Sequence, residues 1–430
     1  MTAPSPTSET TSPTRTERRC LIALLVLAAL LRVGVICWKP DSLAEDRDLY
    51  WGIANQLVTS HTFANPVSGM RTAYRPPLYP ILLAGILWVG GGVKLLAVVQ
   101  VGLGLATTWL TWKLGRKLGL NGNSLVAAAF VALNPLLIQM TALAMTETLC
   151  TFLLIVLMHC VVDRQTSDFR ARMGVLFGLT ALCRPTVWAF AVLSAVVSVI
   201  DLFLPKPKDT RRLLGSVLRD WLVIGFACSV MIVPWGIRNV DVFEVFVTTT
   251  THGGYTLYLG NNDTAYDAEI ARPTEAQWDS RAWQLTIPYP HLGEGADIEL
   301  LRDRWMTDHA KEWIRQHPRE FVELCWLRVK RFWNVFPGGS DAESLPLFVR
   351  WGMAVFFVAE LSLAALGLWR LRRDEWRAWW PLVLLVVSFA LVHVVYWSNL
   401  RMRAPVEPVL ALLAARGFVG RRECEDAKFC

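Results

Sequence analysis

The sequence predicts an all-α polytopic membrane protein, and three observations carry that prediction. Of its 430 residues, 53% are hydrophobic and 18% are charged, whereas soluble proteins carry roughly 25% charged residues. Apolar runs near the length of about 20 residues that a helix needs to cross a bilayer recur along the chain. Short basic clusters separate these runs. Together these features exclude a soluble globular enzyme.

The basic clusters indicate which helix ends face the cytoplasm, because Lys and Arg accumulate on that side of a membrane. The clusters are Arg15 to Arg19, Lys113 to Lys117, Arg164 to Arg172, Lys206 to Arg219, Arg370 to Arg377, and Arg421 with Arg422. Ten spans fit between them, near residues 20–38, 93–113, 123–142, 145–163, 172–184, 186–204, 217–237, 350–369, 378–396 and 404–418. Both termini are then cytoplasmic, and the protein is expected in the cell membrane, in contact with its lipids.

One apolar run is too short to count as a span. Leu78 to Gly92 has about 15 residues, so a helix there would reach roughly 22 Å against a hydrocarbon core of about 30 Å. Counting it would also move Lys113 and Lys117 to the outside. We therefore expect an interfacial or half-inserted helix on the outer face.

The spans divide the chain into a series of regions. Residues 1–19, rich in Ser, Thr and Pro, are predicted to be a disordered cytoplasmic tail. The other regions are a transmembrane half at 20–237 with a first outer loop at 39–77, an outer-face loop domain at 238–349, C-terminal transmembrane helices at 350–418 and a cytoplasmic tail at 419–430. The loop domain should be mainly helical, with helices from Asp297 to Gln316 and from Pro318 to Phe336, since Pro318 suits a first turn and Pro337 a stop.

Carboxylates and arginines gather on the outer side of this topology. The first outer loop carries Asp46 and Asp48, then Tyr50, and then Arg75 before a Pro-Pro pair. Near the outer ends of later spans lie Glu147, Arg184, Arg238, Arg401 and Arg403. Guanidinium groups hold phosphate by bidentate, charge-assisted hydrogen bonds, which indicates a site for an anionic lipid-linked substrate.

Each of these residues also has a plain structural interpretation. An acidic run such as 45–48 is often a solvated loop, and Glu147 suits the first turn of a helix. Arginines near helix ends can extend to lipid headgroups, as we expect for Arg32 in the first span.

Nucleic-acid binding and metal binding have no support in the sequence. The formal net charge is +7, but the basic residues report topology and form no continuous stripe. The 7 histidines and 9 cysteines show no ligand spacing and no disulfide framework. We therefore expect neither a nucleic-acid partner nor a metal site.

An ordered set of motifs strengthens the functional interpretation. The motifs are Asp46-Arg47-Asp48-Leu49-Tyr50, Tyr74-Arg75-Pro76-Pro77, Thr146-Glu147, Arg184-Pro185, Pro234-Trp235-Gly236-Ile237-Arg238, Leu259-Gly260-Asn261-Asn262 and Arg401-Met402-Arg403-Ala404-Pro405. In this order they resemble the GT-C superfamily of membrane glycosyltransferases. More narrowly, they are similar to dolichyl-phosphate-mannose protein mannosyltransferases and aminoarabinose transferases. The resemblance runs from Cys20 to Gly417.

The resemblance implies an inverting transfer of a sugar from a polyprenyl-phosphate donor to an acceptor hydroxyl of a glycan, lipid or protein on the outer face. It implies that Asp46 is the general base, with Asp48 as the fallback, and that Arg75 binds the donor phosphate. Further phosphate ligands would be Arg184, Arg238, Arg401 and Arg403, supported by Tyr50, Glu147, Asn261 and Asn262. A lipid phosphate leaves without a nucleotide, so no cofactor or metal is required.

One position departs from the narrower pattern. Aminoarabinose transferases have an acid immediately before the basic residue of the Pro-Pro motif, and Tyr74 stands there in this chain. Lipid A modification is therefore the less favoured form of the reaction.

Two other functions use the same residues. A transporter or flippase would guide the lipid phosphate past the arginines, with Asp46 as a proton relay. An oligosaccharide ligase or polymerase would take a different donor. Against transport, the charges lie at one face, whereas transporters place their sites near the bilayer midplane.

Overall fold

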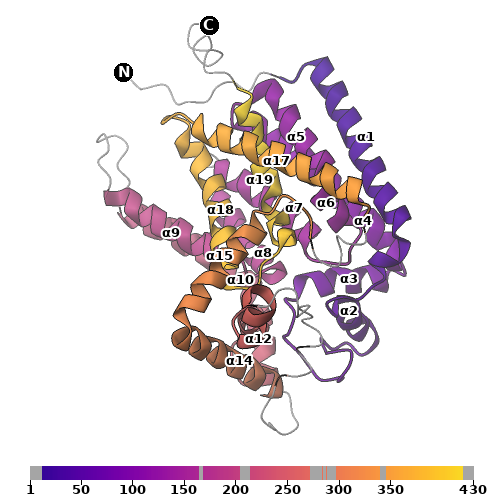
Figure 1. Ribbon diagram of the computed structural model, residues 1–430, viewed down its shortest axis with the longest axis vertical. Helices are drawn as coiled ribbons and strands as arrows, with labels where there is room; N and C mark the ends of the chain where they lie inside the picture. The colour runs from indigo at the N-terminus through magenta and orange to yellow at the C-terminus, as the bar shows by residue number, and fades with distance from the viewer. Residues whose placement is uncertain are drawn as a thin grey trace.

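The computed structural model describes residues 12–163, 168–203, 214–271, 283, 287, 297–338 and 345–419. Within these ranges the regular secondary structure is helical, apart from one isolated antiparallel bridge between Ala64 and Arg71, which confirms the all-α prediction (Figure 1). The elements are α1 Arg15–Trp38, η1 Pro40–Leu43, α2 Tyr50–Thr59, α3 Leu78–Trp88, α4 Gly92–Lys117, η2 Asn121–Asn123, α5 Ser124–Leu133, α6 Pro135–Thr141, α7 Glu147–Val162, α8 Phe169–Cys183, α9 Val187–Phe203, α10 Leu214–Phe243, α11 Gly253–Gly260, α12 Asp263–Tyr266, the π-helical turn η4 Asp267–Ala271, α14 Asp297–Gln316, α15 Pro318–Phe332, α17 Leu347–Trp369, α18 Trp376–Val395, η5 Leu400–Val406 and α19 Glu407–Gly417.

Several of these helices are long and apolar enough to cross a membrane. By length and composition α1, α4, α10, α17 and α18 qualify, and the pair α5 and α6, bent by 50°, makes six if it is one span. The chain is therefore an integral membrane protein. Helices occupy all ten predicted ranges, but α7, α8, α9 and α19 have only 16, 15, 17 and 11 residues. A helix of 16 residues reaches roughly 24 Å, so ten crossings remain a prediction.

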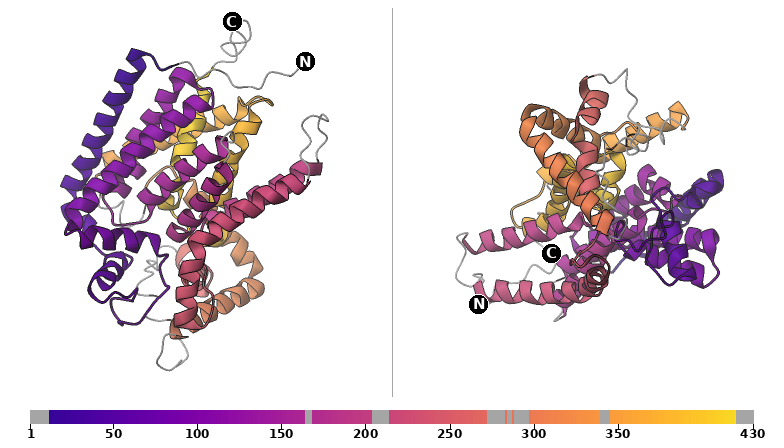
Figure 2. Two further views of the ribbon diagram at one scale, coloured as in Figure 1. Left: turned by 180° about the vertical axis from the view of Figure 1, so that it is seen from behind. Right: turned by 90° about the horizontal axis from the view of Figure 1, so that it is seen from below.

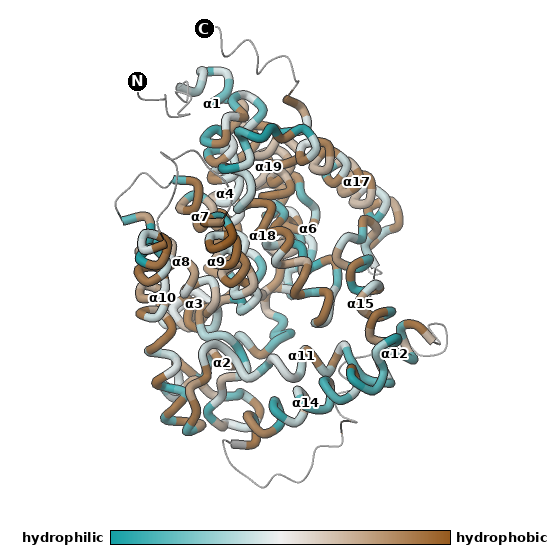
Figure 3. Tube along the Cα trace, turned by 90° about the vertical axis from the view of Figure 1, so that its left-hand side faces the viewer, coloured by the Kyte–Doolittle hydropathy of each residue, from teal (hydrophilic) through white to brown (hydrophobic). Residues whose placement is uncertain are grey.

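The polar segments lie at one end of the helical bundle. In Figure 1, α2, α12 and α14 lie at the end opposite the start of α1 and the end of α19. Figure 3 shows α14 as mostly hydrophilic, below a bundle of apolar helices. On one flank α9 and the first part of α10 project side by side (Figure 2). The segments that contain α2, α12 and α14 are therefore gathered at one end of the bundle.

Several boundaries differ from those that the sequence predicts. Residues 15–19, assigned to the disordered tail, form the first turn of α1, because the Thr14 side chain accepts a hydrogen bond from the Glu17 N–H at 3.1 Å. The rest of the predicted tails lies mostly outside the described residues, as does most of the basic cluster at 206–219. The run at 78–92 does form a helix, α3, whose interfacial placement remains a prediction.

In the predicted loop domain, α14 has the expected bounds, whereas α15 ends at Phe332, four residues early. The reason is Arg403, whose guanidinium donates to the carbonyl oxygens of Phe332 and Asn334 at 3.3 and 3.1 Å. Because Arg403 donates to these two carbonyl oxygens, they do not need the N–H donors that a further helical turn would supply. Helix α10 continues to Phe243, past its predicted end at 237.

The bend between α5 and α6 results from Pro135. Proline has no N–H, so the Val131 carbonyl loses its helical donor. Arg32 of α1 supplies it: its guanidinium donates to the carbonyls of Val131 and Ala132, each at 3.2 Å. Arg32 is 1% exposed, and a Cβ at Gly104 would lie 2.5 Å from its Nε. The expectation that Arg32 extends to the headgroups was wrong, because these carbonyls hold it inside.

Replacing Arg32 by methionine should therefore destabilise the bend. Each buried carbonyl left without a donor costs about 1–3 kcal/mol, so Arg32→Met should lower the thermal midpoint of the solubilised protein by several degrees. The double variant Arg32→Met, Pro135→Ala should recover part of the loss, since alanine restores the N–H. Arg18→Met, exposed on the same helix, is the control. No change in Arg32→Met would contradict this role.

Candidate functional site

The turn before α2 places two acids in different surroundings. Leu49, at the N-cap position, has φ 64° and lies in the left-handed region, which costs roughly 1–2 kcal/mol for a residue other than glycine. A leucine side chain cannot cap a helix, and Asp46 does so instead. Its Oδ1 accepts from the Trp51 N–H at 3.0 Å and its Oδ2 from the Gly52 N–H at 2.7 Å. Both oxygens of Asp46 are thus engaged by the start of α2.

Asp48, two residues later, binds Arg75. The guanidinium donates from Nη2 to Asp48 Oδ1 at 3.0 Å and from Nε to the Asp48 carbonyl at 2.9 Å. It also lies over the rings of Tyr50 and Tyr74, 5.5 and 5.0 Å from their centroids. Arg75 therefore joins the turn before α2 to the turn before α3.

Glu147 forms a second carboxylate centre at the start of α7. It is 1% exposed. Its Oε1 lies 2.9 Å from Arg184 Nη1 and 3.2 Å from Arg401 Nε. Arg184 follows α8, where its Nη2 also contacts the sulfur of Met402 at 2.9 Å, and Arg401 belongs to η5. Three segments that are distant in the sequence therefore meet at one carboxylate.

The two centres act electrostatically as one group, which we call the arginine cluster: Asp48, Arg75, Glu147, Arg184 and Arg401. Burial would raise the pKa of Asp48, but the positive charges of Arg75 above all, and then of Arg401, hold it below its ordinary value. Asp48 is therefore ionised at pH 7. Three arginines face two carboxylates, so the cluster has one positive charge in excess, which suits an anionic ligand.

His252 extends the aromatic wall beside Arg75. Its ring centroid lies 4.4 Å from that of Tyr74 and 4.9 Å from that of Tyr255. Burial, together with the charge of Arg75, holds the pKa of His252 well below its ordinary value, so the ring is neutral at pH 7. The sequence did not single it out, because it has no partner at ligand spacing and reaches the site only through the fold.

Two charged residues clamp the first outer loop from outside the cluster. Glu299 of α14 accepts from the Ala73 N–H at 2.8 Å and from the hydroxyls of Thr72 and Thr251. Arg238 of α10 donates to the Thr72 carbonyl at 2.7 Å. The guanidinium of Arg238, a predicted phosphate ligand, is therefore bound to the backbone of this loop.

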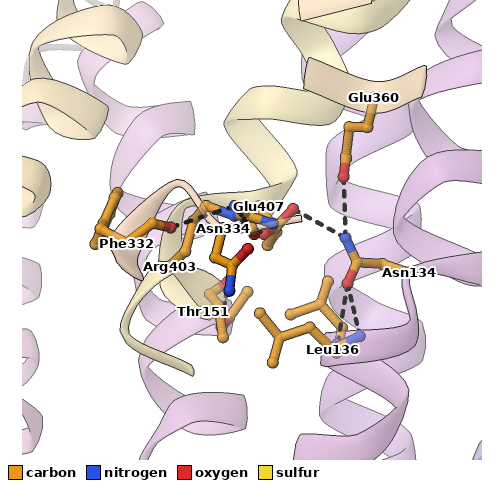
Figure 4. A network of polar contacts seen from close by, with 10 residues as sticks. Asn134, Leu136, Thr151, Phe332, Asn334, Glu360, Arg403 and Glu407 are labelled. Carbon is orange, nitrogen blue, oxygen red and sulfur yellow. Dashed lines mark hydrogen bonds and ion pairs between the residues drawn. The ribbon is translucent and has the colours of Figure 1, made fainter. Parts of the chain in front are cut away.

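Arg403, another predicted phosphate ligand, lies in a separate buried network (Figure 4). Its Nε donates to Glu407 Oε1 at 2.6 Å. Asn134, at the bend between α5 and α6, donates to Glu407 Oε2 at 2.9 Å and to Glu360 Oε2 at 3.3 Å. All four side chains are fully buried. The network joins η5 and α19 to α17 and to the end of α15.

Asn261 and Asn262 shape the corner between α11 and α12. Arg328 donates to Asn261 Oδ1 at 3.0 Å, and Asn261 Nδ2 donates to the Leu257 carbonyl at 2.7 Å. Asn262 Oδ1 accepts from the Ala265 N–H at 2.8 Å at the start of α12. The polar groups of both side chains are thus used in local structure.

The predicted site residues therefore fall into two sets. The arginine cluster, with Tyr50 beside it, brings together members of five separate motifs of the sequence. Outside the cluster, with contacts of their own, lie Asp46, Arg238, Asn261, Asn262 and Arg403. In the described part of the chain, no group of three or more His, Cys, Asp or Glu side chains is arranged to hold a metal ion.

The sequence matches no family model and no curated protein. The fold, however, is similar to that of the oligosaccharyltransferase AglB from Archaeoglobus fulgidus. The complex of AglB with an inhibitory peptide and a dolichol-phosphate has a TM-score of 0.51 at 14% identity, over 93% of this chain and 50% of that one. The apo form of the Archaeoglobus fulgidus oligosaccharyltransferase gives 0.50 at 14%, over 92% and 50%. Its form tethered to an acceptor peptide with the NVT sequon gives 0.51 at 13%, over 92% and 49%.

This chain thus spans about half the length of the oligosaccharyltransferase. At such low identity the likeness is one of fold alone, and the GT-C resemblance of the motifs remains a prediction. The narrower resemblance to protein mannosyltransferases and aminoarabinose transferases remains a prediction. The chain is an integral membrane protein whose fold is similar to about half of the Archaeoglobus fulgidus oligosaccharyltransferase.

Proposed function

We propose that the protein transfers a sugar from a polyprenyl-phosphate donor to an acceptor hydroxyl on the outer face of the membrane, with inversion. The observation that carries this proposal is the arginine cluster, in which three arginines and two carboxylates meet with one positive charge in excess. A similar fold in an oligosaccharyltransferase whose structure contains a dolichol-phosphate supports a lipid-phosphate donor. The acceptor is a glycan, lipid or protein.

Contacts between helix ends support the proposed topology of ten spans with both termini cytoplasmic. Ends that the positive-inside rule assigns to the cytoplasm pair with one another, while the arginine cluster joins ends assigned to the outside. The pairs on the cytoplasmic side are Arg116 with Glu17 at 2.6 Å, Lys117 with Asp163 at 2.7 Å and Arg416 with Glu375 at 2.9 Å. If α4 or α7 had the opposite orientation, ends assigned to the cytoplasm would pair with ends assigned to the outside.

Of the two acids in the first outer loop, the contacts favour Asp48 as the general base. Both oxygens of Asp46 cap α2, whereas the side-chain contact of Asp48 with Arg75 uses Oδ1. In the proposed reaction the other oxygen of Asp48, Oδ2, accepts the proton of the acceptor hydroxyl. The oxygen of that hydroxyl attacks the anomeric carbon of the donor sugar at the same time. The bond from that carbon to the phosphate oxygen breaks, and the lipid phosphate leaves with the electron pair.

The arginines stabilise the departing phosphate in this scheme. Negative charge grows on the lipid phosphate as the glycosidic bond breaks, and fixed cations in a partly dehydrated site stabilise such charge strongly. Arg75, Arg184 and Arg401 supply the cations. Glu147 orients the last two, and the ring of Tyr50 supports the first. Arg238 and Arg403 act at a distance, by holding the segments that carry the site.

The choice between the two acids is open to a direct test. Asp48→Asn keeps a hydrogen-bond acceptor for Arg75 but cannot take a proton, so transfer by the folded variant should fall by about 100- to 10,000-fold. Asp46→Asn loses one of the two oxygens that accept from the N–H groups of α2, so it should lower the thermal midpoint, at a cost of about 0.5–1.5 kcal/mol, and retain most transfer. Transfer by both variants is measured as consumption of polyprenyl-phosphate sugars in proteoliposomes, followed by mass spectrometry. The thermal midpoint is measured by thermal unfolding of the solubilised protein.

The opposite pattern, an active Asp48→Asn and an inactive Asp46→Asn, would move the base two residues back along the chain. Full activity in both variants would make the loop a solvated acidic segment and would refute the general-base mechanism.

The pH dependence gives an independent check on the pairing with Arg75. Arg75→Gln removes the charge that holds the pKa of Asp48 low. The pKa of Asp48 should rise, so the base becomes protonated at a higher pH and the acid limb of the pH–rate profile moves upward. Arg238→Gln, the same change outside the cluster, should leave the limb in place. An unmoved limb in Arg75→Gln would mean that Asp48 is not the titrating base.

A further inference from the structure

A cavity of about 330 Å³ lies beside α11, α12 and α14, apart from the arginine cluster. It combines aromatic rings, carboxylates and imidazoles. Its lining includes Tyr258, Asp263, His309, Glu312, Trp313 and His317. None of these residues takes part in the proposed transfer chemistry, so the cavity is a separate place for a ligand.

Four polar side chains of the cavity offer hydrogen-bond acceptors, namely His309, His317, Asp263 and Glu312. His309 and His317 each direct Nδ1 to a carbonyl of their own helix, at 2.8 and 3.2 Å. A carbonyl can only accept, so Nδ1 carries the proton and Nε2 of a neutral ring is an acceptor. Asp263, which accepts from the Trp313 Nε1 at 2.7 Å, and Glu312 add two carboxylates. The cavity therefore suits a neutral molecule rich in O–H donors and disfavours a phosphate.

Aromatic rings connect this cavity with the arginine cluster. Tyr74, over which Arg75 lies, contacts His252, which stacks on Tyr255. Tyr258 follows one turn later on α11, about 4.5 Å further along the helix axis. Its ring lies 5.7 Å from that of Trp305. Aromatic side chains thus follow one another from the cluster to the cavity. We call this series the aromatic path.

We propose that this cavity binds a saccharide, and that the acceptor of the transfer is a glycan chain lying along the aromatic path. The inference rests on the proposed function and names its acceptor class. Sugar rings pack their C–H faces on tryptophan and tyrosine rings, and their hydroxyls donate to carboxylates and imidazole nitrogens. A lipid acceptor would need an apolar groove, which the charged lining does not offer.

Saccharide binding by the full chain in lipid nanodiscs, without any donor, tests this directly. The probes are maltose and α-1,2-mannobiose, with sorbitol as an open-chain polyol, and the readout is saturation-transfer difference NMR. At least one disaccharide should bind in preference to sorbitol. The double variant His309→Ala, Glu312→Ala, exposed on α14, should bind it about tenfold more weakly or worse, because charge-assisted hydrogen bonds are lost.

The double variant Asp308→Ala, Lys311→Ala is the matched control, since both residues are exposed on the same helix and neither lines the cavity. It should bind like the parent chain. Equal binding in the cavity variant would overturn the proposal. So would a lack of disaccharide binding at millimolar concentration, or binding of the tripeptide Gly-Thr-Gly in place of sugars. Intact sugar transfer without saccharide binding would refute this inference alone, and binding without transfer would refute the proposed function alone.

Discussion

Two carboxylates hold three arginines together at the loop-bearing end of the bundle, and the geometry of the site depends on these pairs. A carboxylate as buried as that of Glu147, at 1% exposure, is costly without a cation. Arg184 and Arg401 provide it from the end of α8 and from η5. Asp48 holds Arg75 in the same way. Charge therefore fixes the relative positions of segments as distant in the chain as those of Glu147 and Arg401, where apolar packing alone would leave the loops free to vary.

The same pairs leave the cluster suited to bind an anion. Arg184 Nη1 and Arg401 Nε are buried and lie near Glu147 by charge, without a well-directed hydrogen bond. A phosphate oxygen would give such donors the short, charge-assisted bonds that guanidinium groups favour. Around the cluster, Arg238 and Glu299 fix the first outer loop, and the network of Arg403 fixes η5 from within the bundle. Binding groups and supporting groups are thus distinct, although both include arginines.

Residues that follow local rules could be predicted from the sequence, and residues governed by distant backbone groups could not. The alternation of apolar runs and basic clusters predicted the helices, and Pro318 predicted the start of α15. The burial of Arg32 depends on a carbonyl released by Pro135, about 100 residues away, and no local pattern indicates it. Arg403 does have a local signal, since Glu407 follows at the spacing of a helical ion pair. The difference between Asp46 and Asp48 lies in their partners, since the first N–H groups of α2 bind Asp46, whereas Arg75 reaches Asp48 only through the fold.

The central claim is that the arginine cluster binds the phosphate of a polyprenyl-phosphate lipid. A cryo-electron microscopy structure of the protein with a polyprenyl phosphate bound tests it most directly. We expect the phosphate to lie within hydrogen-bond distance of at least two of Arg75, Arg184 and Arg401. Asp48 should lie beside the space that the anomeric carbon of a donor would occupy. A phosphate held at the middle of the bilayer, or in contact with none of these arginines, would contradict it.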